Sequence, residues 1–174
     1  QPSTTVEGHI RGGKVRETIY LVDGLAVQDV IQGGAGTELP LSAISQMTIQ
    51  TGGFDAEYGD ALSGVVNVIS RSGGDTHEVS VRLAKDDLFG GEEVSHRNEL
   101  ELAASGPLGS PNLSYFSASN LVLSDTPWWQ DTQHFFDSPV RKEFNGLAKV
   151  DYKSLGHGRL TAELIYSLQR WRDY

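Results

Sequence analysis

The most informative part of this chain is Thr51-Gly52-Gly53-Phe54-Asp55-Ala56-Glu57-Tyr58-Gly59-Asp60-Ala61-Leu62-Ser63-Gly64-Val65-Val66-Asn67-Val68-Ile69-Ser70-Arg71. It begins with a glycine pair, continues through a short polar turn that carries an aromatic residue, and ends in a β-branched run. Gly59 and Gly64 allow tight turning and a close approach of two backbones. The run that follows Gly64 has apolar side chains on both faces, which predicts a buried strand over residues 65–70.

Two further motifs lie upstream, Ile10-Arg11-Gly12-Gly13 and Tyr20-Leu21-Val22-Asp23-Gly24. An Asp-Gly pair between apolar stretches is a strong signal for a tight turn, because glycine takes positive φ without steric cost. We therefore expect a strand over residues 17–22, a turn at Asp23-Gly24 and a returning strand over 25–27. A short helix is expected over 40–45, where proline stands in the first turn, and a strand over 47–50.

In order and spacing these motifs resemble the plug domain of TonB-dependent outer-membrane receptors, which import scarce nutrients through a plugged barrel. The resemblance covers residues 6–75 by motif and the remainder by strand pattern. It implies an α+β plug segment over residues 1–75, followed over 76–174 by the first five strands of an antiparallel transmembrane β-barrel, an incomplete barrel. The plug motif then comprises Gly12, Gly13, Asp23, Gly24, Tyr58, Gly59, Gly64 and Asn67. Tyr58 and Asn67 are expected to pack and to form hydrogen bonds rather than to do chemistry.

Composition excludes several classes of protein. The 174 residues carry a net charge of -9, and the lysines and arginines are scattered, so a nucleic-acid partner is not expected. The chain has no cysteine, which excludes disulfides and thiolate metal sites. No apolar run approaches the ~20 residues of a membrane-spanning helix. The first residues do not read as a signal peptide, so we expect a processed or truncated product.

After Gly73-Gly74 the sequence changes to alternation with a period of two, which predicts five strands. The longest apolar face contains Leu160, Ala162, Leu164, Tyr166 and Leu168. In the strand over 113–123 the facing is ambiguous. The four connections run long, short, long and short, with the short ones at residues 106–112 and 154–158. Outer-membrane barrels have this arrangement, with short periplasmic turns and longer extracellular loops.

The resemblance also implies an arginine in the plug that pairs with glutamates of the barrel and so holds the plug in the lumen. Arg11 is the candidate arginine, and the candidate partners on the strands present are Glu99, Glu101 and Glu163. The alternative for Arg11 is a solvated surface arginine. Trp128 and Trp129 in the longest loop are candidates for stacking on a ligand, with an interfacial anchor or internal loop packing as the alternative.

Catalytic sites are not expected. The five histidines are dispersed, with no pair at ligand spacing, and there is no phosphate-binding loop, nucleophile elbow or calcium loop. We therefore predict a non-enzyme without a cofactor or metal: a fragment of an outer-membrane transporter for a siderophore, cobalamin or oligosaccharide. Its expected partners are outer-membrane lipid, a small nutrient and the TonB energy-transducing complex, which would bind an N-terminal segment outside these residues. The alternative is a soluble or periplasmic β-rich binding module with a plug-like motif.

Overall fold

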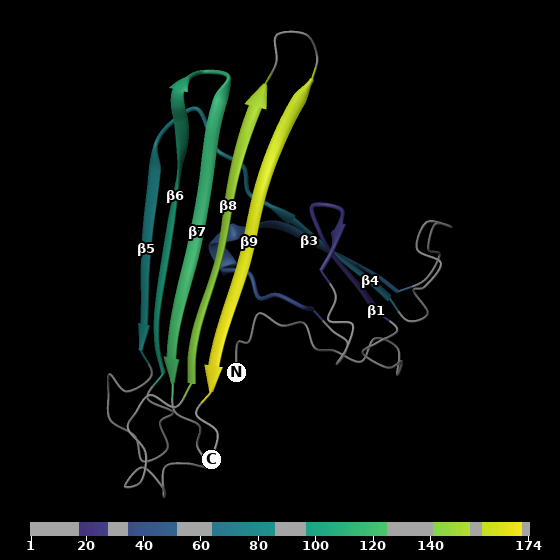
Figure 1. Ribbon diagram of the computed structural model, residues 1–174, viewed down its shortest axis with the longest axis vertical. Coiled ribbons are helices and arrows are strands. Elements are labelled where there is room, and N and C mark those ends of the chain that lie inside the picture. Colours follow the sequence, from purple (N-terminus) through teal and green to yellow (C-terminus); the bar gives the residue numbers. More distant parts are fainter. Residues whose placement is uncertain are drawn as a thin grey trace, which may run out of the picture. The chain divides into compact units, whose positions relative to one another are not determined.

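The computed structural model describes residues 18–27, 35–51, 64–85, 97–124, 141–153 and 158–171. The chain divides into two compact units, residues 1–71 and 72–174. Each unit is built around one sheet (Figure 1). The two units are described separately below.

The sheet of the first unit has four strands in the order β2-β1-β4-β3. They are β1 (Thr18–Val22), β2 (Leu25–Ala26), β3 (Ile44–Gln50) and β4 (Gly64–Ser70). Strand β4 runs parallel to β1 and antiparallel to β3, so the β-branched run lies in the interior of the sheet. Its first half is buried as expected, with Val65 and Val66 each 2% exposed, whereas Ile69 is 41% exposed. Leu21 and Val65 form a cluster of buried side chains in this unit, with Ile19 packed against them.

The Asp-Gly pair forms the expected tight turn between β1 and β2. Asp23 has φ of 48° and Gly24 has φ of 83°, and positive φ at both central residues is the geometry of a type I′ hairpin turn. The helix expected over residues 40–45 is shorter in the structure. It is a single turn of 3-10 helix, η3 (Leu41–Ala43), because β3 already begins at Ile44 and claims the remaining residues.

The second unit contains five antiparallel strands in sequence order, each paired with the next (Figure 1). They are β5 (Glu78–Lys85), β6 (Asn98–Ser110), β7 (Leu113–Ser124), β8 (Arg141–Lys153) and β9 (Arg159–Trp171). The predicted change to alternating strands is therefore confirmed. No helix in the part of the chain that the structure describes is long and apolar enough to cross a membrane.

The connection between β6 and β7 differs from the expectation. The sequence predicted a compact turn over residues 106–112, but β6 continues to Ser110 and only Pro111 and Asn112 form the turn. The pairing with β7 shifts register between Pro107 and Ser110, and Gly109 has φ of 66°. Such an irregularity lets the strand continue past a proline that cannot donate to the ladder.

A glycine on β8 makes room for an aromatic ring on β9. Gly146 stands directly opposite Tyr166 in the register, and a Cβ on Gly146 would lie 2.6 Å from the ring of Tyr166. The ring of Phe144, two residues earlier on β8, meets the ring of Tyr166 edge-on at 5.1 Å. The tyrosine therefore covers the glycine, which is a known way of fixing the register of two strands.

Candidate functional site

The sheet of the second unit has two chemically different faces, because successive side chains of a strand point to opposite sides. Residues paired across neighbouring strands share a face, so the register assigns each side chain. The first face, which we call the polar face, holds every acidic residue of the five strands: Glu78, Glu99, Glu101, Glu143, Asp151 and Glu163. The opposite face, which we call the apolar face, holds none.

The three carboxylates predicted as partners of Arg11 all lie on the polar face. Glu101 is opposite Arg82, with 3.5 Å between its Oε2 and the arginine Nη1, and its side chain is 5% exposed against 57% for Arg82. Glu99 accepts a hydrogen bond from Arg97 at 3.1 Å. Glu163 faces Lys149 across β8 and β9. Glu101 and Glu99 are thus each paired with an arginine, Arg82 on the neighbouring strand and Arg97 just before β6.

A denser polar cluster lies where β8 ends and β9 begins, and the sequence reasoning missed it. Asp151 is 1% exposed and its carboxylate accepts from Arg159 Nε at 3.1 Å and from Thr161 Oγ1 at 2.6 Å. Arg159 Nη2 also donates to Ser72 Oγ at 2.8 Å. The cluster therefore ties Ser72, which precedes β5, to the far edge of the same sheet. The alternation placed Asp151 and Arg159 on one face, but no local signal pointed to Ser72.

Asp23 does more than form a turn. Its carboxylate accepts from the backbone N–H of Ser70 at 3.0 Å and from the hydroxyl of Ser70 at 2.5 Å. Ser70 is the last residue of β4 and is 3% exposed. The turn after β1 thus also holds the end of the neighbouring parallel strand. Among the other plug-motif residues, Gly64 opens β4 opposite Thr18, and Asn67 lies between Leu21 and Thr48.

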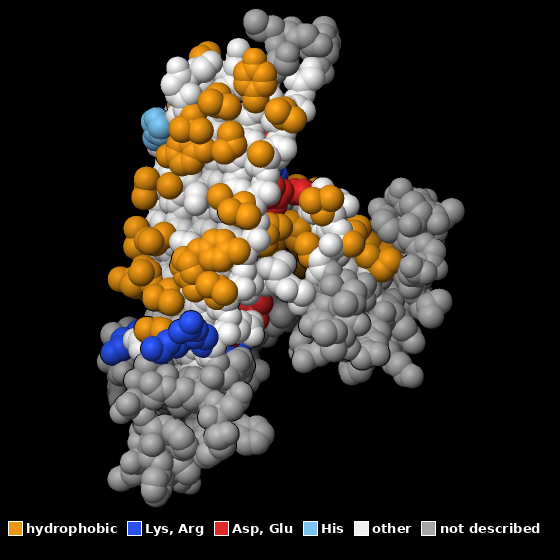
Figure 2. Space-filling view, in the orientation of Figure 1, with side chains coloured by type: hydrophobic (Ala, Val, Ile, Leu, Met, Phe, Trp, Pro, Cys, Tyr) orange, Lys and Arg blue, Asp and Glu red, His pale blue; other side chains and the backbone are white. Residues whose placement is uncertain are grey.

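The apolar face is broad and exposed. Figure 2 shows hydrophobic side chains spread over much of it, with lysine and arginine side chains gathered at one end. Leu160, Leu164 and Leu168 on β9 are 71%, 63% and 63% exposed, and in the register they share this face with Phe144, Val150 and Tyr152 of β8. The facing that the sequence left ambiguous on β7 is settled, because Phe116 is buried on the polar face while Tyr115 lies on the apolar face.

Several predicted site residues lie outside the described residues: Arg11, Gly12, Gly13, Tyr58, Gly59, Trp128 and Trp129. The structure therefore does not test the arginine of the plug or the two tryptophans of the longest loop. Within the described ranges, no group of three or more histidine, aspartate or glutamate side chains is arranged to hold a metal ion.

Comparison with known proteins gives a sequence relative and similar folds. No family model matches the chain. Over 72 residues it is 35% identical to the TonB-dependent transporter Oar of Myxococcus xanthus, a stretch that covers 41% of this chain and 7% of that protein. The chain thus spans a small part of the length of this curated relative.

Two solved structures share the fold over 91% of this chain. The siderophore receptor PirA of Acinetobacter baumannii matches with a TM-score of 0.66 and 20% identity, over 25% of its own length. A mutant of the ferric enterobactin receptor PfeA of Pseudomonas aeruginosa, in complex with enterobactin, matches with a TM-score of 0.64 and 19% identity, over 26% of its length. These relatives are named as a transporter and as receptors rather than as enzymes. Proteins of these kinds lie in the bacterial outer membrane, which is the location that the sequence predicts. By sequence over 72 residues the chain is similar to a TonB-dependent transporter, and over most of its length it shares the fold of these two receptors.

Proposed function

We propose that this chain is a piece of a TonB-dependent transporter that takes up a scarce nutrient across the outer membrane. Residues 1–75 would belong to its plug and residues 76–174 would be the first five strands of its barrel. The observation that carries the proposal is the two-faced sheet, with an exposed apolar face free of acidic residues and a polar face that holds all of them. Strands of a transmembrane barrel alternate in this way between lipid and lumen.

The dimensions of the apolar face support a lipid-facing role. On β9 it extends from Leu160 to Leu168, about 27 Å along the strand at roughly 3.4 Å per residue. A strand tilted by about 40° then spans about 21 Å between the outermost Cα atoms, and the side chains extend this to near the ~25 Å apolar band of outer-membrane barrels. A five-stranded sheet also leaves β5 and β9 as edges, which further strands of a closed barrel would pair.

The plug would be held in the lumen by an ion pair between Arg11 and a carboxylate of the polar face. Glu101 is the strongest candidate, because its side chain is 5% exposed, against 14% for Glu99. A second cation would then bind to a carboxylate that is already desolvated. Glu99 and Glu163 are the other candidates. Trp128 and Trp129 would contact the ligand from the extracellular side.

The relatives indicate which substrate class to test first. The two similar structures are receptors for a siderophore and for ferric enterobactin, so a ferric siderophore is the first class to test, followed by cobalamin and oligosaccharides. Energy would come from the TonB complex.

The experiment is an uptake assay with the full-length protein in a Gram-negative strain that lacks its own receptors for these nutrients. Labelled ferric siderophores, cobalamin and oligosaccharides are offered to cells with and without a functional TonB complex. We expect accumulation of one class that is lost when TonB is inactivated. Uptake of none of them, or recovery of the protein in the soluble periplasmic fraction, would instead support a β-rich binding module.

A further inference from the structure

The connection between the two units is held at both of its ends. It consists of residues 71–77, between β4 and β5, and we call it the connector. The backbone N–H of Arg71 donates to the carbonyl of Ala43 at 2.8 Å, within the first unit. The hydroxyl of the next residue, Ser72, accepts a hydrogen bond from Arg159 at 2.8 Å, within the second unit. The hold on the chain therefore passes from one unit to the other at the peptide bond between Arg71 and Ser72.

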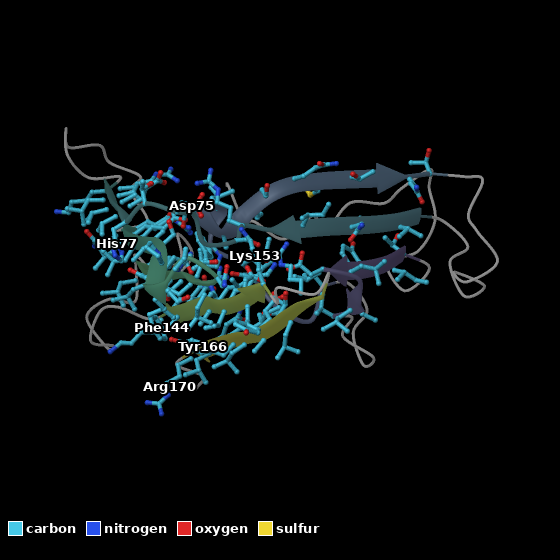
Figure 3. The ribbon with its side chains drawn as sticks, turned by 90° about the horizontal axis from the view of Figure 1, so that it is seen from above. Asp75, His77, Phe144, Lys153, Tyr166 and Arg170 are labelled. Atoms are coloured by element: carbon cyan, nitrogen blue, oxygen red, sulfur yellow. The ribbon has the colours of Figure 1, made fainter. Side chains whose placement is uncertain are left out.

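The connector crosses the polar face at the end of the sheet where the compact turns lie. Figure 1 shows it in teal, running across the strands to the start of β5. Figure 3 shows its Asp75 on the same side of the sheet as Lys153, opposite Phe144. Ser72 contacts Arg159, the first residue of β9, which is the edge strand farthest from β5. The connector therefore spans the sheet from one edge to the other.

Gly73 lies so close to β7 that a side chain would not fit. A Cβ there would lie 2.4 Å from the carbonyl oxygen of Tyr115, 2.7 Å from its nitrogen and 2.8 Å from the Cβ of Ser114. The first two atoms belong to the backbone of a strand that is paired on both sides, so they cannot move aside without disturbing the sheet. Gly74 differs, because the nearest atoms to a Cβ there are 3.9 and 4.0 Å away, an ordinary contact. Of these two adjacent glycines, only Gly73 is needed for the close approach.

The bonds around Arg159 differ in how much they cost to break. Arg159 binds Asp151 through two atoms, with Nε 3.1 Å from Oδ1 and Nη2 2.9 Å from Oδ2, and the Asp151 side chain is 2% exposed. Breaking such a pair is costly, since it leaves a desolvated carboxylate without its partner. Ser72 is exposed, so its hydroxyl regains water when its bond to Arg159 breaks, and the net cost is small. The connector can therefore be released while the arginine stays fixed on the sheet.

Resting on the proposed transporter function, we propose that the connector is a releasable restraint on the plug. In the resting protein Ser72 and Gly73 hold it against the polar face, and its release lets the plug leave its resting position. Arg159 is a positioning residue, because Asp151 fixes its guanidinium so that Nη2 meets the Ser72 hydroxyl. The compact turns of outer-membrane barrels face the periplasm, which is the side from which the TonB complex would act. Since the restraint acts on the C-terminal end of the plug, it limits movement of the plug as a whole.

The first test measures how readily the connector opens in the full-length protein in lipid vesicles. Trypsin cuts after Arg71 when the surrounding chain is released, so the cleavage rate reports the population of the open connector. Mass spectrometry identifies the fragment that ends at Arg71. Ser72→Ala removes one hydrogen bond, and we expect cleavage to be about five- to tenfold faster. Gly73→Ala forces the connector away from β7 by overpacking and should accelerate cleavage by at least about fivefold.

Gly74→Ala is the matched control for Gly73→Ala, because the chemical change and its effect on the unfolded chain are the same. Its cleavage rate should differ from that of the parent protein by no more than about twofold. Arg159→Gln should accelerate cleavage in the parent protein but add little in the Ser72→Ala background, because the bond is already lost. Urea unfolding of the barrel should be unchanged in Ser72→Ala, since the pair between Arg159 and Asp151 remains.

The second test asks whether the connector restrains the plug. It uses cells without a functional TonB complex, so that the plug is at rest. Small solutes that cannot cross a plugged barrel should enter faster through Ser72→Ala and Gly73→Ala than through the parent protein or Gly74→Ala. TonB-dependent uptake of the nutrient by the parent protein is measured in a matched strain with TonB.

Three results would overturn the proposal: cleavage after Arg71 at the parental rate in Ser72→Ala and Gly73→Ala, equal acceleration by Gly74→Ala, or faster cleavage without faster entry of solutes. A loss of barrel stability in Ser72→Ala would also overturn it, because the bond would then support the barrel rather than restrain the plug. The transporter function fails on a different result, the absence of TonB-dependent uptake by the parent protein, which does not alter the cleavage rates.

Discussion

Asp23 has two roles, and its neighbours in the sequence reveal only one of them. The Asp-Gly pair predicts a tight turn from local backbone preferences, and the structure confirms it. The bonds from the Asp23 carboxylate to Ser70 span 47 residues, so no local pattern could have predicted them. The same is true of the hydrogen bond between Arg159 and Ser72, which are 87 residues apart.

The second role of Asp23 can be tested directly. Asp23→Ala removes the acceptor of the buried Ser70 N–H and hydroxyl, which should cost about 1–3 kcal/mol. It also places alanine at a φ of 48°, a conformation that asparagine tolerates better. Hydrogen exchange of peptides from β1 and β4 in the full-length protein should become faster, by about 5- to 150-fold at the slowest amides.

Asp23→Asn is the control for this prediction. It retains one acceptor oxygen for Ser70 and suits the turn, so its exchange should lie between those of the parent protein and Asp23→Ala. If both variants exchange like the parent protein, the bonds to Ser70 contribute nothing to the stability of this sheet.

At the level of strands, the alternation of side chains was enough to predict five antiparallel strands and the facing of most of them. It was not enough where the pattern itself is broken. On β7 the adjacent Tyr115 and Phe116 give conflicting signals, and only pairing with β6 and β8 decides which of them is buried. On β6 the residues Gly106-Pro107 read as a turn, but the ladder to β7 continues through an irregularity there. Where a strand ends depends on how it pairs with its partner strand, and that pairing cannot be read from the local sequence.

The packing of Tyr166 over Gly146 predicts a specific interaction between β8 and β9. Gly146→Ala would place a methyl group 2.6 Å from the tyrosine ring, so it should destabilise the folded protein by about 1–3 kcal/mol through overpacking. The double variant Gly146→Ala/Tyr166→Ala removes the clash, and its urea midpoint should equal that of Tyr166→Ala alone. If Gly146→Ala lowers the stability equally with and without the ring of Tyr166, the two residues do not interact.

Substitutions on the apolar face of β9 can test whether that face lies in a lipid bilayer. Leu160, Leu164 and Leu168 lie on one face at different heights and are all well exposed. In a bilayer, replacement by arginine costs about 2–4 kcal/mol at the midplane and about 0–1 near the interfaces. Leu164→Arg should therefore destabilise the protein in lipid vesicles more than Leu160→Arg or Leu168→Arg does, as measured by urea unfolding.

The three positions serve as controls for one another, because the chemical change is the same at each. In a soluble module with this face in water, all three substitutions would have small effects. In a module that covers the face with a second layer of structure, the loss of stability at each position would depend on its contacts with that layer. It would not depend on the position's height along the strand. A maximum at Leu164 is specific to a membrane.

For the molecule as a whole, the sequence motifs indicated a resemblance to one family, and the structure added the two-faced sheet. The sequence could not order the three carboxylates proposed to hold the plug. Their side chains share a face by simple alternation, but burial depends on the neighbouring strands. The structure separates them, because Glu101 is buried beside Arg82 while Glu99 pairs with Arg97 at the end of β6.

That distinction leads to a prediction for Arg11 in the full-length receptor. Breaking a buried arginine–carboxylate pair costs about 3–5 kcal/mol, against about 0–1 for an exposed pair. Arg11→Ala should therefore loosen the plug while the barrel stays folded, which would be measured as faster proteolysis of residues 1–75 and greater leakage of small solutes.

If Glu101 is the partner, Glu101→Ala should loosen the plug in the parent protein but add little in the Arg11→Ala background, because the pair is already broken. Glu78→Ala, which removes another carboxylate of the polar face, should have the same small effect in both backgrounds. Strictly additive effects of Arg11→Ala and Glu101→Ala would exclude this pair, and the same cycle with Glu99 or Glu163 would then identify the partner. Leakage, protection and uptake equal to those of the parent protein in every variant would show that Arg11 is a surface residue.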